Sequence, residues 1–238
     1  MLRFQAASPV VWIKLDEDPI RRKATKFSPN ESDMLLVIDL QRDFCSGGAL
    51  AVPDGDAVVP VINRISASFQ HIILTQDWHP AGHTSFASSH PKAKPFDRIQ
   101  VAYGIQTLWP DHCVQQTPGA EFHPGLDDLV FKRTELIVRK GFDRQIDSYS
   151  AFVENDKRTT TGLAGYLRER GFRRIFLAGL AYDYCVRYSA VDAVSAGFEA
   201  HVLQDACRAI GQIEETEEEF ERVGVHCLTA ADLSAVGT

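Results

Sequence analysis

Short apolar runs alternate with helical patterns along most of this chain, and no other feature of the sequence constrains the fold as strongly. The runs are rich in β-branched and aliphatic residues, and the segments between them carry apolar residues at helical spacing. This alternation is typical of a parallel sheet with helices covering both faces. We therefore predict an α/β protein with a mostly parallel, six-stranded sheet.

The boundaries of the predicted elements follow from the same pattern. We predict strands over residues 35–38, 71–75, 136–138, 174–178, 200–203 and 224–228, and helices over residues 56–69, 161–170, from 183 to about 197, and 214–222. Thr161 and Asp183 are the expected helix caps, and Gly171 is expected to end the second helix.

A long irregular stretch, residues 78–134, separates the second and third predicted strands. Connections in compact domains usually have about 4–6 residues, and longer ones are commonly functional. Five of the eight histidines lie in this stretch: His79, His83, His90, His112 and His123. Chance clustering in a histidine-rich surface loop is the alternative explanation.

Composition excludes several classes of partner. The formal net charge of -7 argues against nucleic acid, because nucleic-acid binders usually carry a clustered basic face. No apolar run approaches the roughly 20 residues that span a bilayer, so we expect no membrane role. The length of 238 residues favours a single domain, and a small molecule is the expected partner.

The five cysteines are odd in number, scattered, and without a C-x-x-C pair. This pattern fits neither a disulfide framework nor a zinc finger, and it favours a reduced, cytoplasmic compartment. Cys45, Cys113, Cys207 and Cys227 are expected to be structural. Cys185 differs because it follows a predicted strand at the start of a helix, where the helix dipole favours a thiolate. Packing of a small buried side chain is the alternative role.

Polar side chains follow four of the predicted strands at their carboxyl ends, where parallel sheets bind ligands. Asp39 ends the first strand, Asp77 and His79 the second, and Lys140 the third, while Cys185 follows the fourth. A thiol nucleophile needs a proton acceptor, and Asp39 is the candidate. Lys140 is a candidate cation that would hold both groups charged. Each of the two could instead have an ordinary strand-end role.

Asp77 and His79 form a D-x-H pair whose side chains point to the same side of an extended chain. His112 is a candidate third ligand from the long stretch. One carboxylate and two imidazoles suit Zn, Fe(II) or Mn and leave coordination positions open. A D-x-H pair alone often occurs by chance. A divalent-metal site therefore requires a fold that brings His112 close to this pair.

Five segments, taken together, resemble the conserved blocks of the nicotinamidase/pyrazinamidase members of the isochorismatase-like hydrolases. They occur in the family's order and are residues 37–45, 76–80, 109–114, 139–141 and 179–186. The resemblance covers nearly everything from Met34 onward. It implies a three-layer α/β/α Rossmann-like domain over residues 34–238, preceded by an N-terminal extension of residues 1–33.

The resemblance also implies roles for the site residues. Asp39, Lys140 and Cys185 would form a catalytic triad, with the backbone N–H groups of Ala181 and Cys185 as oxyanion hole and a cis peptide between Leu180 and Ala181. Asp77, His79 and His112 would hold one divalent metal ion that binds the pyridine nitrogen of the substrate. Phe44 and Trp109 would sandwich the ring.

Two departures from the family pattern concern the site. Some members have a further ligand histidine after the D-x-H pair. His83 lies near that position, although Ser85 lies closer to it in some family patterns. We expect His83 behind the metal ligands or in a lid over the site. Tyr184 replaces a histidine that some members have beside the nucleophile.

The leading functional hypothesis is hydrolysis of nicotinamide to nicotinate and ammonia in NAD salvage, with pyrazinamide as a side substrate. A second hypothesis keeps the cysteine chemistry and changes the substrate to another small amide or carbamoyl compound. A third is a metal-binding or inactive scaffold, against which the complete set of Asp39, Lys140 and Cys185 argues. A homo-oligomer, the metal's identity and a fourth protein ligand are left open.

Overall fold

The computed structural model describes residues 27–234 and contains one six-stranded sheet in which every pairing is parallel. The strand order is β5-β2-β1-β6-β7-β8. The strands are β1 (Asp33–Ile38), β2 (His71–Asp77), β5 (Thr134–Lys140), β6 (Arg174–Leu180), β7 (Glu199–Arg208) and β8 (His226–Leu228). All six predicted strands are confirmed, most of them longer than the pattern indicated. Residues 1–26 of the predicted N-terminal extension lie outside the described part.

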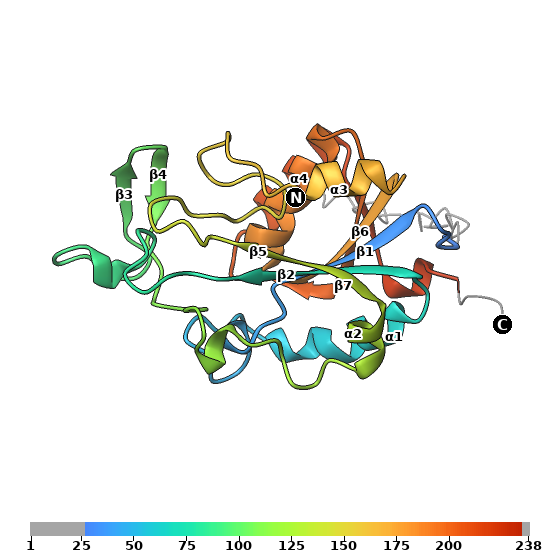
Figure 1. Ribbon diagram of the computed structural model, residues 1–238, viewed down its shortest axis with the longest axis horizontal. Helices are drawn as coiled ribbons and strands as arrows, with labels where there is room; N and C mark the ends of the chain where they lie inside the picture. The colour runs from blue at the N-terminus through green and yellow to red at the C-terminus, as the bar shows by residue number, and fades with distance from the viewer. Residues whose placement is uncertain (1–26, 235–238) are drawn as a thin grey trace, which may run out of the picture.

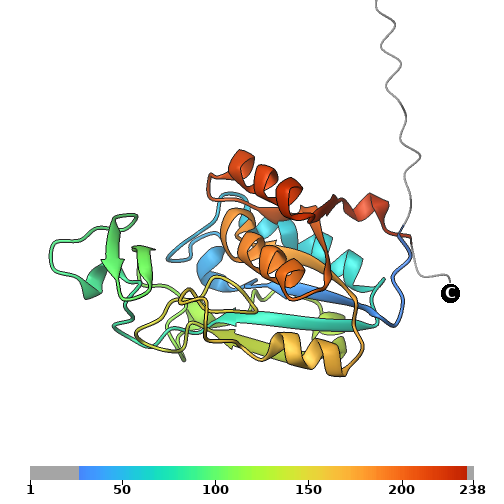
Figure 2. The same cartoon turned by 90° about the horizontal axis from the view of Figure 1, so that it is seen from above.

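Helices cover both faces of the sheet and complete the three layers (Figure 1). On one face lie α1 (Val59–Ser66) and α2 (Asp128–Arg133). The other face is covered by α3 (Leu163–Glu169), α4 (Arg187–Ser195) and α5 (Ile213–Val223). The view from above shows α4 and α5 side by side (Figure 2).

The period of two in a strand explains how one apolar run serves both layers. Leu35 and Val37 belong to the core under α1 and α2, whereas Met34, Leu36 and Ile38 belong to the core under α3, α4 and α5. Successive side chains of a strand point to opposite faces, so a strand buried on both sides is apolar throughout. This is why the sequences of the central strands are continuous apolar runs.

The long stretch between β2 and β5 is less irregular than predicted. It contains α2 and an antiparallel hairpin, β3 (Arg98–Val101) and β4 (Gly104–Thr107), which projects beyond the end of the sheet in both views (Figures 1 and 2). The hairpin was missed because its four-residue strands are mostly exposed or half-buried and carry little apolar pattern.

One predicted helix cap is confirmed in part and the other is wrong. The N-cap of α3 is Gly162, in the left-handed region at φ 89°, but the Thr161 hydroxyl accepts from the N–H of Leu163, the first residue of the helix, at 3.2 Å and donates to the Ala151 carbonyl. Asp183 lies inside a π-helical turn, Tyr182–Val186, that leads into α4, and Ala181 is the N-cap of that turn. Gly171 does end α3, at φ 78°.

The topology brings the predicted site residues together. The chain builds β2 and β5 on one side of β1 and then crosses to β6, β7 and β8 on the other. Loops diverge at such a switch point and leave a crevice at the carboxyl ends of the strands. Asp39 follows β1 and Cys185 follows β6, so the two residues flank this crevice. Gly179 is required there, because a Cβ would lie 2.0 Å from the Ile38 carbonyl oxygen.

Candidate active site

The Lys140 ammonium is the centre of the site. Its side chain is fully buried at the end of β5, and Nζ lies 2.8 Å from Asp39 Oδ2 and 3.5 Å from Cys185 Sγ. It also donates to the Ser148 carbonyl at 3.0 Å and forms an ion pair with Asp77. Burial by itself would lower the pKa of Lys140, but the two carboxylates outweigh burial and hold the pKa well above its ordinary value. The lysine is therefore charged.

The Asp39 carboxylate has one oxygen held and one available. Oδ1 accepts a hydrogen bond from the Thr75 hydroxyl at 2.6 Å, which fixes the side chain. Within residues 27–234, Oδ2 accepts no conventionally oriented hydrogen bond, although the Lys140 ammonium faces it. Burial raises the pKa of Asp39, with Lys140 acting in the opposite direction. A buried carboxylate with an available oxygen beside a thiol is suited to accept its proton.

The Cys185 thiol is buried in the π-helical turn, and its surroundings differ from those predicted. Burial raises the pKa of this thiol well above its ordinary value, and Lys140 lowers it only in part. The thiolate expected from the helix start is therefore wrong for the free protein, in which the thiol is neutral. The reason is that removal of the thiol from water, together with the nearby carboxylates of Asp39 and Asp77, disfavours the thiolate more than a helix dipole favours it. Deprotonation has to accompany the reaction.

Asp183, whose predicted capping role is corrected above, has a different function in the fold. Its carboxylate accepts hydrogen bonds from the backbone N–H groups of Ile210, Gly211 and Gln212 at 2.8–2.9 Å. This ties the turn that carries Cys185 to the segment that precedes α5. Sequence spacing could not show this contact, because the partners are nearly thirty residues apart.

The three predicted metal ligands converge. Asp77 Oδ2 lies 3.5 Å from His79 Nε2 and 3.6 Å from His112 Nε2. The Nδ1 atoms of the two histidines face the carbonyls of Gly141 at 2.9 Å and Pro110 at 2.8 Å, so each Nδ1 carries the proton and donates it. Both Nε2 lone pairs then point at one carboxylate oxygen, an arrangement typical of metal-binding histidines. These residues fit a divalent cation.

The neighbours of this set support the same interpretation. Burial would raise the pKa of Asp77, but the Lys140 ammonium is the largest opposing cause, so the pKa lies well below its ordinary value and the carboxylate is charged. Gly141 has φ 64°, and a Cβ there would lie 2.4 Å from the His79 ring. The backbone thus approaches the imidazole as closely as glycine allows, which holds the ring in place.

His83 lies behind the ligand set rather than in it. Its ring packs against the His79 ring with centroids 4.3 Å apart and an interplanar angle of 36°. Nε2 donates to the carbonyls of Asp143 at 2.9 Å and Ile146 at 3.2 Å, and Nδ1 accepts from Ser85. Both ring nitrogens are therefore occupied. Burial lowers the pKa of His83 to about 4, so the ring is neutral and joins two loops at the site.

We expect His83 to make stability depend on pH between about pH 4 and pH 6.5. Its folded pKa of about 4 lies below the unfolded value of 6.5, so stability is lost as pH falls through this window. The full shift corresponds to about 3 kcal/mol. The advantage of the parent over His83→Gln in urea unfolding should shrink by that amount from pH 7 to pH 4.

The measured quantity has to be the difference in unfolding free energy between parent and variant, because Glu154 changes stability with pH in the opposite direction. Burial raises its pKa from 4.5 to about 7, so its contribution to stability is lost as pH rises. Both proteins contain Glu154, and subtraction removes its effect. An advantage of the parent that is equal at pH 7 and pH 4 would contradict the neutral, hydrogen-bonded state of His83.

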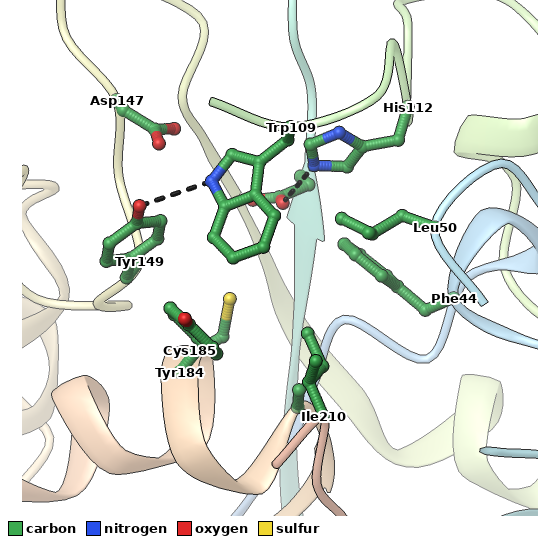
Figure 3. A pocket seen from close by; sticks show the side chains of 11 residues that line it. Phe44, Leu50, Trp109, His112, Asp147, Tyr149, Tyr184, Cys185 and Ile210 are labelled. Carbon is green, nitrogen blue, oxygen red and sulfur yellow. Dashed lines mark hydrogen bonds and ion pairs between the residues drawn. The ribbon is translucent and has the colours of Figure 1, made fainter. Parts of the chain in front are cut away.

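A narrow pocket, partly open to solvent, lies over Cys185 (Figure 3). The Cys185 sulfur points into it, and His112 lies at one side. Asp77, whose Oδ2 is 3.6 Å from His112 Nε2, also lines the pocket. Phe44 and Trp109 line the pocket as predicted. The lining residues that the sequence did not predict are Leu50, Asp147, Tyr149, Ala181 as a wall residue, Tyr184 and Ile210.

Some of these had a signal in the sequence. Asp147 and Tyr149 follow β5, and Ile210 follows β7, so each lies beyond the carboxyl end of a strand, where ligand contacts concentrate. Leu50 had no such signal. The peptide between Leu180 and Ala181 is cis, as expected, and Ala181 and Cys185 both border the pocket.

A second group of ligand types, Cys45, Asp56 and His123, lies apart from the pocket. Here the hydrogen bonds oppose a metal. His123 Nδ1 accepts from the Gly125 N–H at 3.0 Å, so Nε2 carries the proton and donates to Asp56 at 3.1 Å. No lone pair on that ring is available to a cation. This group closes a loop by hydrogen bonding.

The fold is the three-layer α/β architecture of a hydrolase family, with a buried cysteine, carboxylate and lysine at a switch point of the parallel sheet. Residues 33–232 match the Isochorismatase domain, so the chain belongs to that family. It is an amidohydrolase of the nicotinamidase/pyrazinamidase type. Among residues 27–234, no helix combines the length and apolar character needed to cross a bilayer.

Three similar proteins support this assignment. The nicotinamidase of Acinetobacter baylyi is 48% identical over 202 residues, which cover 84% of this chain and 93% of the relative. The L. infantum protein PnC1, solved in complex with nicotinate, has a TM-score of 0.75 and 38% identity, over 86% of this chain and 96% of that one. The pyrazinamidase of Pyrococcus horikoshii, solved in complex with zinc, has a TM-score of 0.67 and 36% identity, over 83% and 99%.

Proposed function

We propose that this protein hydrolyses nicotinamide to nicotinate and ammonia, with pyrazinamide as a side substrate. One observation carries the proposal. The Asp39 carboxylate, the Lys140 ammonium and the Cys185 thiol meet beside a pocket at whose edge Asp77 and His112 present metal-ligand atoms. Nicotinamide and pyrazinamide suit both, because each has an amide carbonyl for the thiol and a ring nitrogen for a Lewis acid.

The triad supports a two-stage hydrolysis. Asp39 takes the thiol proton as Cys185 Sγ bonds to the amide carbon, and the Ala181 and Cys185 N–H groups would receive the carbonyl oxygen as it becomes an anion. Asp39 then returns the proton to the departing nitrogen, which leaves as ammonia. A water, deprotonated by Asp39, attacks the thioester, and the C–S bond breaks to release the acid and restore the thiol.

Lys140 keeps its charge through both stages. It lies within 3.5 Å of Cys185 Sγ and closer to Asp39, so it stabilises whichever of the two is negative. The proton can therefore move between thiol and carboxylate without leaving an uncompensated charge in a buried site.

Asp77, His79 and His112 are the residues that would hold the metal. When bound, the ion would supply a Lewis-acid position for the ring nitrogen. The zinc-bound P. horikoshii pyrazinamidase supports a metal in this family. Phe44 and Trp109 would provide the apolar walls for the two faces of the ring.

The alternative substrate is another small amide or carbamoyl compound without a ring nitrogen. It would use the same triad but not the metal position, so metal dependence separates the two hypotheses. We also propose a cytoplasmic location, which the five free cysteines favour, and a role in NAD salvage, where nicotinate is the usable product.

The function is tested by measuring ammonia release from nicotinamide with purified protein, before and after dialysis against a chelator. We expect turnover by the parent, a fall of at least about 100-fold on chelation, and recovery on adding back Zn, Fe(II) or Mn. The Asp77→Asn variant should bind less metal and behave like the chelated parent. No ammonia from nicotinamide would refute the substrate, and turnover insensitive to metal would favour the alternative.

A further inference from the structure

Gln106 is a buried polar residue on an otherwise exposed arm. It lies in β4 of the hairpin with 1% of its surface exposed, whereas its neighbour Ile105 is 56% exposed. A buried amide has to find hydrogen-bond partners, and an amide without them would cost stability. Gln106 finds its partners in the loops that follow β5, beside the pocket.

The Gln106 amide nitrogen donates toward three acceptors. They are the Asp147 carboxylate at 2.7 Å, the Thr107 carbonyl at 2.7 Å and the Tyr149 hydroxyl oxygen at 3.1 Å. The carboxylate and the carbonyl can only accept, so this end of the side chain has to be the nitrogen. The orientation of the amide is thereby determined.

The Gln106 carbonyl oxygen is held as firmly. It accepts from the Tyr103 hydroxyl at 3.0 Å and from the Asn155 side-chain amide at 3.4 Å. Tyr103 also accepts from the Asp147 N–H at 3.1 Å, which gives a second hydrogen-bonded connection between the hairpin and the segment that carries Asp147. The glutamine therefore joins the hairpin to the segment that carries Asp147 and Tyr149.

The connection continues into the pocket wall. Tyr149 accepts from the Trp109 indole N–H at 3.2 Å, as the dashed line in Figure 3 marks, and its ring meets Trp109 and Tyr184 edge to face. The phenol oxygen thus receives N–H groups from two sides, one from Gln106 and one from Trp109. All three aromatic rings line the pocket.

We propose that Gln106 is a positioning residue for substrate binding, which sets the Trp109 wall of the pocket through Tyr149 and Asp147. The hairpin is then part of the binding site although it lies beyond the sheet. The identity of the ring substrate rests on the proposed function, but the order imposed on Trp109 does not. Gln106 contacts neither Cys185 nor the metal ligands, so its effect falls on binding rather than on chemistry.

The first test is Gln106→Leu, with Gln100→Leu as matched control. Gln100 is an exposed glutamine on the same hairpin whose side-chain amide reaches only its neighbour Val101. For Gln106→Leu we expect the KM for nicotinamide to rise about tenfold while kcat stays within about threefold of the parent. Gln100→Leu should have parental values of both. A parental KM for Gln106→Leu would overturn the proposal, whether or not kcat falls.

The second test is Gln106→Glu, which adds a carboxylate facing Asp147. Glutamate keeps the length of glutamine but has no N–H donor, so it removes the hydrogen bonds to the Asp147 carboxylate and the Thr107 carbonyl and places two carboxyl groups face to face. We expect the KM of this variant for nicotinamide to rise at least as much as that of Gln106→Leu, with kcat again within about threefold of the parent. A parental KM would contradict a hydrogen-bonding role.

The third test needs no substrate. The near-ultraviolet circular dichroism of Trp109 is identified as the part of the parental spectrum that Trp109→Phe removes. We expect Gln106→Leu to weaken this band and Gln100→Leu to preserve it. If nicotinamide is not a substrate but the band weakens, the positioning role stands and the proposed function fails. An unchanged band in Gln106→Leu refutes the positioning role whatever the substrate.

Discussion

Replacement of Lys140 by methionine is expected to lower turnover by at least about 1000-fold and to destabilise the fold by about 3–5 kcal/mol. The reason is that Lys140 pairs with both Asp39 and Asp77 in a fully buried position. Methionine fills nearly the same volume, so what is lost is the charge. Removal of one partner from a buried ion cluster leaves the remaining charges without compensation.

Urea unfolding and ammonia release measure the two effects, with Lys157→Met as the matched control. Lys157 pairs with Asp192 at 3.7 Å, and its side chain is 54% exposed. An exposed pair of this kind contributes at most about 1 kcal/mol, so the control should keep its stability and activity. Equal stability of the Lys140 and Lys157 variants would show that the buried cluster is not charged as described.

Cys185→Ala is expected to reduce turnover by at least about 10000-fold, because the proposed acyl intermediate forms on this thiol. Stability should change little by comparison, since only a sulfur atom is removed. Cys207→Ala is the matched control. Cys207 is also buried, but it lies within β7 and does not line the pocket.

Mass spectrometry of protein quenched during turnover adds a direct readout. The parent and Cys207→Ala should show a fraction with the added mass of a nicotinoyl group, and Cys185→Ala should show none. Undiminished turnover by Cys185→Ala would refute the thioester route, and so would an adduct on a different residue.

Much of the fold followed from pattern alone. A strand such as β1 is buried on both faces, so it has to be apolar throughout, and that property is visible in the sequence. Since parallel strands end at the same edge of the sheet, strand ends alone located Asp39, Asp77, Lys140 and Cys185 near one another. Their catalytic roles came from the resemblance, and the structure adds the distances.

The state of the cysteine could not be predicted in the same way. A helix start favours a thiolate, yet burial next to two carboxylates keeps the Cys185 thiol neutral. Local sequence shows the helix, whereas desolvation and charge depend on residues from other strands. The capping role predicted for Asp183 failed for a similar reason, because its carboxylate is used by a distant segment.

The sequence by itself thus determined which segments form strands and helices, because that depends on periodicity. It also determined which reactive residues lie at the ends of the strands. Only the tertiary structure decided how charge and hydrogen bonds are distributed among them. Lys140 joins the thiol to the metal-ligand set, and Gln106 reaches the pocket wall from the hairpin, through contacts between distant segments. Such contacts leave no period in the chain, because they depend on which loops the topology brings to the same edge of the sheet.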